Sequence, residues 1–189
     1  MKIGRAEFWT AFFTGALAGA TLYALFYARA QINAAHDEAQ VQHLLTLEQQ
    51  YEQEPLVTYR KHLAEKRLKG EVEPDELYNV LDFFETIGNL VDRGYLNESD
   101  IWDNFSYPVL NLNADAGNII RDYQREDPAA YIGFISLVDK MEKIESDHHG
   151  ALAHPSKDDI LEFYRGKLSV GAGARIKLRG HPSTHSKKE

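Results

Sequence analysis

The sequence predicts an all-α protein with a single N-terminal transmembrane helix, a helical stalk and a bundle of about five helices. Three observations support this fold class. An uncharged run of bilayer length occupies residues 8–28, and apolar residues recur at helical spacing through much of the chain that follows. No alternating run bounded by turn residues indicates a strand. The expected segments are a membrane anchor at 1–30, a stalk at 31–54, an acidic helical bundle at 55–166 and a basic, disordered tail at 167–189.

The anchor is predicted by its length, because residues 8–28 as a helix would span about 30 Å, the thickness of the hydrocarbon layer. Aromatic residues lie near both ends of the run, where they favour the headgroup level. A cleaved signal peptide is the competing interpretation, since Lys2 and Arg5 give a basic start. The run exceeds the 7–15 apolar residues typical of such signals. A buried core helix is a third alternative, and it fits less well because the run is apolar on all sides.

Gly15 and Gly19 form a G-x-x-x-G motif inside the predicted anchor. Small residues four positions apart allow two membrane helices to approach closely. The motif therefore indicates self-association or docking on another membrane protein. Gly and Ala are also common in membrane helices that form no such pair, so both interpretations stay open.

Charge is distributed unevenly along the chain. The net charge of −8 combines +2 in residues 1–30, −15 in residues 31–166 and +5 in residues 167–189. The acidic middle would repel nucleic acid and anionic lipid, so no nucleic acid is expected to bind this domain. There is no cysteine, which excludes disulfides, thiol catalysis and thiolate metal sites.

The stalk and the bundle follow from helix formers and stop signals. Residues 31–54 contain no Gly or Pro and are expected to continue the membrane helix. Gly70 and Gly94 are predicted to end the first two bundle helices, and Asn97 to cap the next, which Pro108 breaks or kinks. The expected helices are 56–69, 74–94, 97–125 with the interruption at Pro108, 128–147 and 158–165.

Residues 78–88, YNVLDFFETIG, are followed by Arg93-Gly94, Ile101-Trp102 and Tyr107-Pro108. This pattern resembles an uncharacterised bacterial family of small proteins with an N-terminal membrane helix and a helical domain containing an FFE-x-x-G helix. The resemblance covers residues 74 to about 145. It implies the fold and the membrane anchoring, and it brings no established activity or catalytic residue.

Glu85 is the weak catalytic candidate, because a half-buried carboxylate beside Phe83 and Phe84 could act as an acid or a base. A structural role is the alternative, in which Glu85 accepts hydrogen bonds from an Arg, Tyr or Trp of another helix. Gly88 is expected at a close helix crossing.

The segment 147–158 contains the side chains best suited to hold a metal, and His148, His149 and His154 are the weak candidates. Their spacing matches no known helical zinc motif. No phosphate-binding loop, nucleophile elbow or dinucleotide fingerprint occurs, so no cofactor is expected.

Two functions remain. The first is a membrane-tethered interaction module, an accessory or regulatory subunit whose partners are the lipid bilayer and a membrane protein or a second copy bound through the anchor. The second is a membrane-bound enzyme or effector, for example in bacterial antiviral defence, that uses carboxylates or the histidine segment. Arg175, Lys177 and Arg179 in the basic tail are candidates for binding a partner or lipid.

The expected location is the bacterial inner membrane, crossed once. Lys2, Arg5 and the amino terminus outweigh Arg29 in positive charge, which favours the N-terminus inside and the domain outside. A basic tail that binds cytoplasmic lipid would indicate the reverse orientation.

Overall fold

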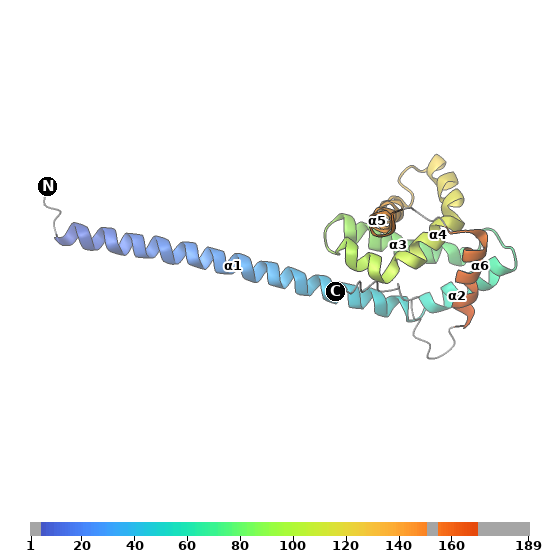
Figure 1. The fold of residues 1–189 in the computed structure, drawn as a ribbon, viewed down its shortest axis with the longest axis horizontal. Coiled ribbons are helices and arrows are strands. Elements are labelled where there is room, and N and C mark those ends of the chain that lie inside the picture. Colours follow the sequence, from blue (N-terminus) through green and yellow to red (C-terminus); the bar gives the residue numbers. More distant parts are fainter. Residues whose placement is uncertain (1–4, 151–154, 170–189) are drawn as a thin grey trace, which may run out of the picture.

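The computed structural model describes residues 5–150 and 155–169, except the side chains of residues 5–13, 15, 16, 18, 149 and 169. These residues form helices and no strand, which confirms the all-α class. In Figure 1 a long helix extends away from a bundle of shorter helices. The helices are α1 (Arg5–Tyr51), α2 (Leu56–Leu68), α3 (Asp75–Asp92), α4 (Glu98–Glu126), α5 (Ile132–His149) and α6 (Lys157–Ser169).

α1 is one continuous helix of 47 residues, about 70 Å long at 1.5 Å per residue. It runs without interruption from the predicted anchor through the predicted stalk. Only its last three turns touch the bundle, where Leu47 and Tyr51 are buried and Gln40 Nε2 donates to the Gly94 carbonyl at 3.3 Å. Among the side chains described, no helical stretch combines the length and apolarity needed to cross a bilayer. Much of the predicted anchor, residues 8–28, lies outside those side chains.

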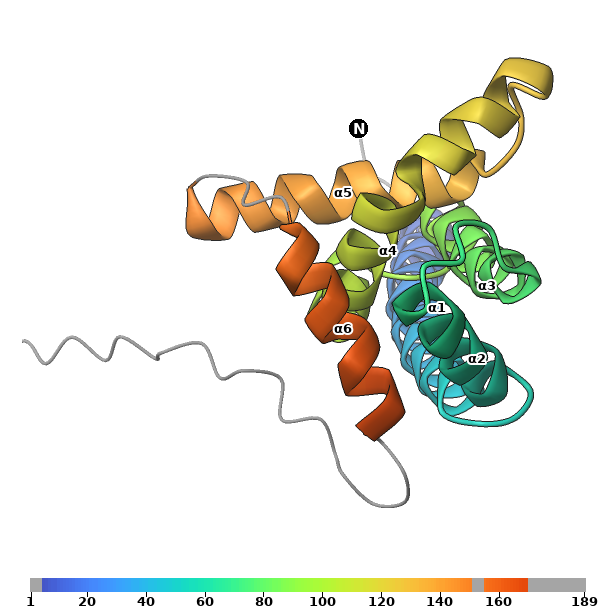
Figure 2. The same ribbon diagram turned by 90° about the vertical axis from the view of Figure 1, so that its right-hand side faces the viewer.

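α3 lies in the middle of the bundle and packs against α5 and α2, while α6 packs against α2 and α4. Figure 2 shows α6 and α5 on one side of this arrangement and α2 and α3 on the other. α3 buries one face almost completely, including Leu77, Leu81 and Phe84. Phe105 and Leu112 of α4 and Phe134 and Leu137 of α5 complete the centre of the core.

Most helix ends match the signals in the sequence. Gly70 and Gly94 adopt φ of 89° and 74° directly after α2 and α3, a conformation that glycine allows at a helix end. The Asn97 side chain accepts a hydrogen bond from Ser99 N at 2.8 Å at the start of α4. These residues therefore end or begin helices as expected.

Two boundaries differ from the expectation. α4 continues through Pro108, because Phe105, Val109 and Leu112 are buried on one face and their packing favours a single helix. α6 passes Gly166 and ends at Ser169, because Phe163 and Tyr164 are buried and Lys167 and Leu168 are half-buried. Residues 167–169, which were expected in the tail, are therefore part of α6.

Candidate functional site

The most distinctive site of the bundle is the place where α1 enters it, which we call the α1 joint: Tyr51 with Arg60, Phe83, Phe84, Phe105 and Lys167. The Tyr51 ring stacks on Phe83 with centroids 5.6 Å apart and meets Phe105 edge-on at 5.5 Å. The Phe84 ring lies 5.9 Å from the Tyr51 ring and also contacts the rings of Phe83 and Phe105. Aromatic pairs in these geometries contribute about 0.5–1.5 kcal/mol each beyond area burial. The last residue of α1 is thus held inside the aromatic core.

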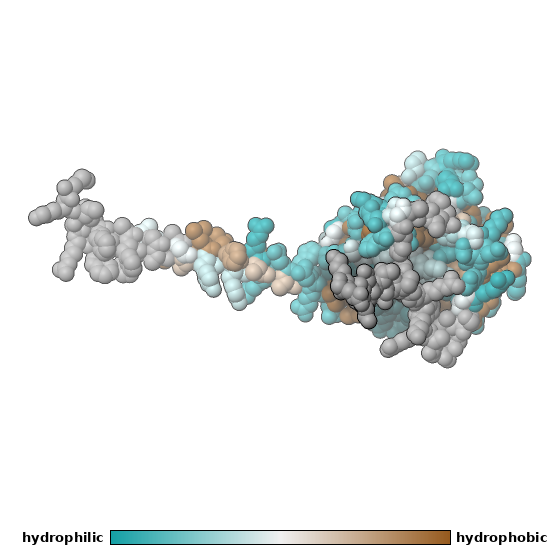
Figure 3. Space-filling view, viewed as in Figure 1, coloured by the Kyte–Doolittle hydropathy of each residue, from teal (hydrophilic) through white to brown (hydrophobic). Residues whose placement is uncertain are grey.

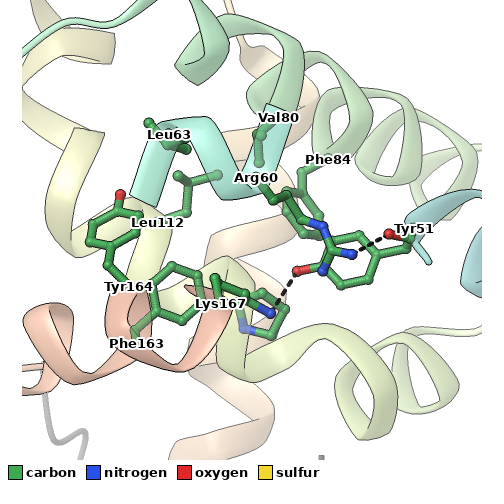
Figure 4. A pocket seen from close by; sticks show the side chains of 10 residues that line it. Tyr51, Arg60, Leu63, Val80, Phe84, Leu112, Phe163, Tyr164 and Lys167 are labelled. Carbon is green, nitrogen blue, oxygen red and sulfur yellow. Dashed lines mark hydrogen bonds between the residues drawn. The ribbon is translucent and has the colours of Figure 1, made fainter. Parts of the chain in front are cut away.

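Two cations complete the α1 joint (Figure 4). The Arg60 guanidinium lies 3.6 Å from the centre of the Tyr51 ring and donates to the Tyr51 carbonyl, an acceptor left open at the end of α1. Lys167 Nζ lies 3.3 Å from the Tyr51 hydroxyl and 5.3 Å from the ring centre. Positive charge is favourable at a helix C-terminus and over an aromatic face. Arg60 and Lys167 therefore tie α2 and α6 to the end of α1.

A small cavity lies beside the α1 joint. It has room for no more than about one water molecule, and its lining is almost entirely apolar. Arg60 is buried, and its Nε finds no hydrogen-bond acceptor among the described residues. The cavity is too small for an organic ligand.

Glu85, the catalytic candidate, lies on α3 and points its carboxylate at the start of α5. Its carboxylate accepts hydrogen bonds from Gly133 N at 3.1 Å and Phe134 N at 2.6 Å, and from Asn89 Nδ2 at 3.2 Å. Tyr131 precedes α5 in a left-handed conformation and gives no side-chain cap. Glu85 therefore supplies from α3 the anionic cap that α5 lacks in its own sequence. Its donors are two backbone amides and an Asn side chain, where an Arg, Tyr or Trp side chain was expected.

Gly88 lies one turn further along α3, against the same end of α5. A Cβ built on Gly88 would lie 1.9 Å from the Gly133 carbonyl oxygen. A Cβ on Gly133 would in turn lie 2.9 Å from the Glu85 carbonyl oxygen. The two backbones touch, so this is the close helix crossing expected at Gly88. The residues of the FFE-x-x-G helix thus belong to the aromatic core, the α5 cap and the crossing.

A second polar cluster joins α2, α4 and α6. Asp115 accepts from the Arg67 guanidinium and from the Tyr164 hydroxyl, the latter at 2.5 Å. Arg67 also donates to the carbonyls of Glu71 and Val72 after α2. Burial, followed by the neighbouring Asp115 carboxylate, raises the pKa of the Tyr164 hydroxyl. An open groove of about 180 Å³ lies beside this cluster, but Asp115 has both oxygens engaged.

Tyrosines gather near the α3–α4 face. Tyr78 donates to Glu73, and its hydroxyl lies 2.8 Å from that of Tyr123. Burial, followed by the charge of Asp82, raises the pKa of Tyr131 to about 12. The hydroxyls of Tyr78 and Tyr131 therefore stay protonated at neutral pH, and that of Tyr78 donates its hydrogen bond to Glu73.

The histidine segment does not form a metal site among the described residues, where no group of three metal-binding side chains converges. The His148 ring stacks on Trp102 at a centroid distance of 4.9 Å. The side chain of His149 and all of His154 lie outside the described residues, so these two candidates stay predictions.

The remaining candidates lie at the two ends of the chain. Gly15 and Gly19 are on α1, far from the bundle; Gly19 is exposed, and a Cβ there would meet no atom within 4 Å. The side-chain surroundings of Gly15 lie outside the described residues. Arg175, Lys177 and Arg179 also lie outside them.

Sequence reasoning missed the roles of Tyr51, Arg60, Arg67 and Asp115. Tyr51 ends a run of helix formers just before Pro55, and a bulky aromatic residue at that position was the signal available. Arg60, Arg67 and Asp115 look like ordinary surface charges in the sequence. Only tertiary packing, including that of α6 against α2 and α4, makes them buried or half-buried.

No curated protein and no solved structure matches this chain. One family model matches residues 11–141, from α1 through most of α5, which is more than half of the 189 residues. The matched region contains the whole FFE-x-x-G helix and the α1 joint except Lys167. The chain therefore belongs to the family described as a domain of unknown function, DUF4760.

Proposed function

We propose that this protein is a membrane-tethered interaction module, an accessory or regulatory subunit of a membrane-associated complex. The observation that carries the proposal is the outer half of α1. Before about Gln40 this helix extends away from the bundle. Its large apolar side chains are exposed, and a partner or lipid could cover them.

The exposed apolar side chains of α1 surround the helix instead of forming one stripe. Successive residues rotate by about 100° around a helix, so neighbouring residues point in different directions. The large exposed residues are Leu17, Leu22, Tyr23, Leu25, Phe26, Tyr27 and Ile32. Figure 3 shows brown surface beside paler residues on the described outer part of α1, whereas teal covers much of the bundle. A single protein partner covers one side of a helix, and lipid covers all sides, which supports a membrane anchor.

The bundle supports an interaction role better than an enzymatic one. Glu85 has its carboxylate engaged by three N–H donors, and Asp115 by Arg67 and Tyr164. Through these contacts both carboxylates hold helices together. The acidic surface, with −15 in residues 31–166, is suited to a partner with a basic face.

The place proposed for this module is the bacterial inner membrane, with a single crossing and the bundle outside. The charge difference across the anchor is small, so the orientation needs its own measurement. A reporter fused after Glu189 that fluoresces only inside, paired with one that is enzymatically active only outside, assigns the side. Gly15 and Gly19 remain the proposed contact with a membrane partner or a second copy, and the open space at Gly19 would allow close approach.

The anchor is tested by flotation of the full chain with vesicles. Leu17→Lys together with Leu22→Lys places two charges in the anchor, each costing about 2.5–3.5 kcal/mol at the centre of a membrane helix. We expect the parent chain to float and this variant to stay in the soluble fraction.

Val41→Lys together with Leu45→Lys is the matched control, because both residues are exposed on the same helix beyond the anchor. This control should float like the parent. A parent chain that does not float, or a control that is lost equally, would overturn the anchor. Sequencing the N-terminus of the floated chain separates an anchor from a cleaved signal.

A further inference from the structure

Three tyrosines from different helices meet on one surface of the bundle, which we call the tyrosine face: Tyr78, Tyr123 and Tyr131 with Glu73 and Asp82. Tyr78 lies on α3, Tyr123 in the last turn of α4 and Tyr131 directly before α5. The rings of Tyr78 and Tyr123 meet edge to face, with centroids 5.7 Å apart and planes at 83°. The Tyr131 hydroxyl interacts with Asp82 and Tyr123. The packing of the bundle thus gathers three rings that are distant in the sequence.

The tyrosine face is open to solvent in part. Tyr123 is 40% exposed, Tyr78 and Tyr131 are half-buried, and the two acidic residues are exposed. When two rings meet at right angles, one of them leaves both of its faces uncovered by the other. The face of a tyrosine ring attracts cations, because its π electrons are negative there. The tyrosine face therefore offers aromatic surface suited to a positive group.

Negative charge accompanies these rings. The same oxygen of Glu73, Oε1, accepts hydrogen bonds from the hydroxyls of Tyr78 and Tyr123. Within residues 5–150 and 155–169, neither Glu73 nor Asp82 forms an ion pair. The two arginines that flank Tyr123 in the sequence donate to other side chains of α4. The two carboxylates are therefore left without a neutralising cation in the described part of the chain.

We propose that the tyrosine face binds an arginine side chain of a partner protein. This rests on the interaction role proposed above and names the residue that the bundle recognises. A guanidinium stacks on an aromatic ring and donates paired hydrogen bonds to a carboxylate, whereas the lysine ammonium is a compact point charge. A quaternary ammonium headgroup has no N–H to donate to Glu73 or Asp82. The chain itself uses the favoured contact at the α1 joint, where the Arg60 guanidinium lies 3.6 Å from the centre of the Tyr51 ring.

The test titrates the full chain in detergent micelles with N-acetyl-arginine methylamide. Tyrosine rings carry an isotope label, and their NMR signals are assigned with single variants. We expect the signals of Tyr78, Tyr123 and Tyr131 to move together and that of Tyr95, an exposed tyrosine outside this face, to stay unchanged. N-acetyl-lysine methylamide should bind about 2- to 5-fold more weakly, because it lacks the stacked guanidinium. Tetramethylammonium should move these signals least.

Variants at the exposed ring test the aromatic part of the face. Tyr123→Leu removes the ring and should weaken binding of the arginine probe by about 2- to 5-fold. Tyr123→Phe keeps the ring and should bind more tightly than Tyr123→Leu. Tyr95→Leu is the matched control and should bind like the parent. Circular dichroism of each variant verifies that the bundle is folded.

A second set of variants tests the carboxylates. Glu73→Gln with Asp82→Asn should weaken binding of the arginine probe by roughly fivefold, because two exposed charge pairs are lost. Glu71→Gln with Asp139→Asn removes the same charge from two exposed positions outside the tyrosine face. This control should bind like the parent.

The outcomes separate this proposal from the membrane anchor. A chain that floats with vesicles but whose tyrosine signals do not move with the arginine probe would overturn the tyrosine face alone. Equal shifts with the lysine probe or with tetramethylammonium would overturn arginine recognition. An equal loss of binding in either control variant would overturn the assignment to this face. A chain that does not float would overturn the anchor alone, since the titration needs no membrane.

Discussion

The outer half of α1 and the bundle contain the same residue types in opposite surroundings. Leu22 on α1 is 68% exposed and Leu77 on α3 is 0% exposed; Tyr27 is 57% exposed and Tyr51, on the same helix as Tyr27, is 7% exposed. The bundle covers its own apolar surface, as a folded domain must. The outer half of α1 does not, although its sequence is the more apolar of the two. This difference is the observation on which the proposed membrane anchor rests.

Two of the tyrosines of α1, Tyr51 and Tyr27, test the comparison most strongly. Tyr51→Ala should lower the free energy of unfolding of the bundle by about 3–5 kcal/mol, because it removes a buried ring and leaves a cavity. Unfolding is followed in detergent by Trp102 fluorescence, in a Trp9→Phe background that leaves one tryptophan. Tyr27→Ala is the matched control and should change the bundle by less than about 0.5 kcal/mol. Equal effects would show that the α1 joint is not part of the bundle core.

One helical glycine from each region, Gly88 and Gly19, sharpens the comparison. Gly88→Ala should destabilise the bundle by about 3 kcal/mol, because the new Cβ meets backbone atoms of Gly133 that no side-chain rotation can move. Gly19→Ala meets no atom within 4 Å and should leave bundle unfolding unchanged. Urea unfolding of both variants measures the difference. A mild effect of Gly88→Ala would mean that α3 and α5 separate at low cost, against the close crossing.

The smallest expected effect concerns Glu85, the residue of α3 that caps α5. Glu85→Gln keeps the shape of the cap but loses its charge, and should cost about 1–2 kcal/mol of bundle stability. Asp139→Asn, an exposed position on α5, should cost less than about 0.5 kcal/mol. Thermal unfolding at neutral pH compares the two. A Glu85→Gln bundle as stable as the parent would remove the capping role and return Glu85 to the catalytic candidates.

Several elements of the fold could be predicted from the sequence for local reasons. The stop at Gly70 and Gly94 follows from the left-handed conformation that glycine adopts there, and the start at Asn97 follows from its capping amide. Gly88 at a helix crossing was also predicted, because a glycine on a broadly apolar helix has few other uses. The end of α6 and the continuity of α4 were not predicted, because burial of Phe163 and Val109 outweighs the local preferences of Gly166 and Pro108.

The candidate site likewise combines features that the sequence predicted with features that only tertiary packing created. Glu85 was identified as a half-buried carboxylate, but its donors are backbone amides of α5, which no pattern of side chains reveals. Arg60 and Lys167 are far apart in the chain and meet only because α2 and α6 both pack at the end of α1. Contacts of this kind depend on tertiary packing and leave no periodic signal in the sequence.

By itself, the sequence determined the helical class, the uneven charge and the apolar run at residues 8–28, because periodicity, composition and length are properties of neighbouring residues. Tertiary structure alone decided that α1 ends inside an aromatic core, that Glu85 caps α5, and that α6 ends beside the base of the stalk. Each of these depends on segments distant in the chain coming together. Packing sets that arrangement, because the bundle buries its apolar faces in one shared core.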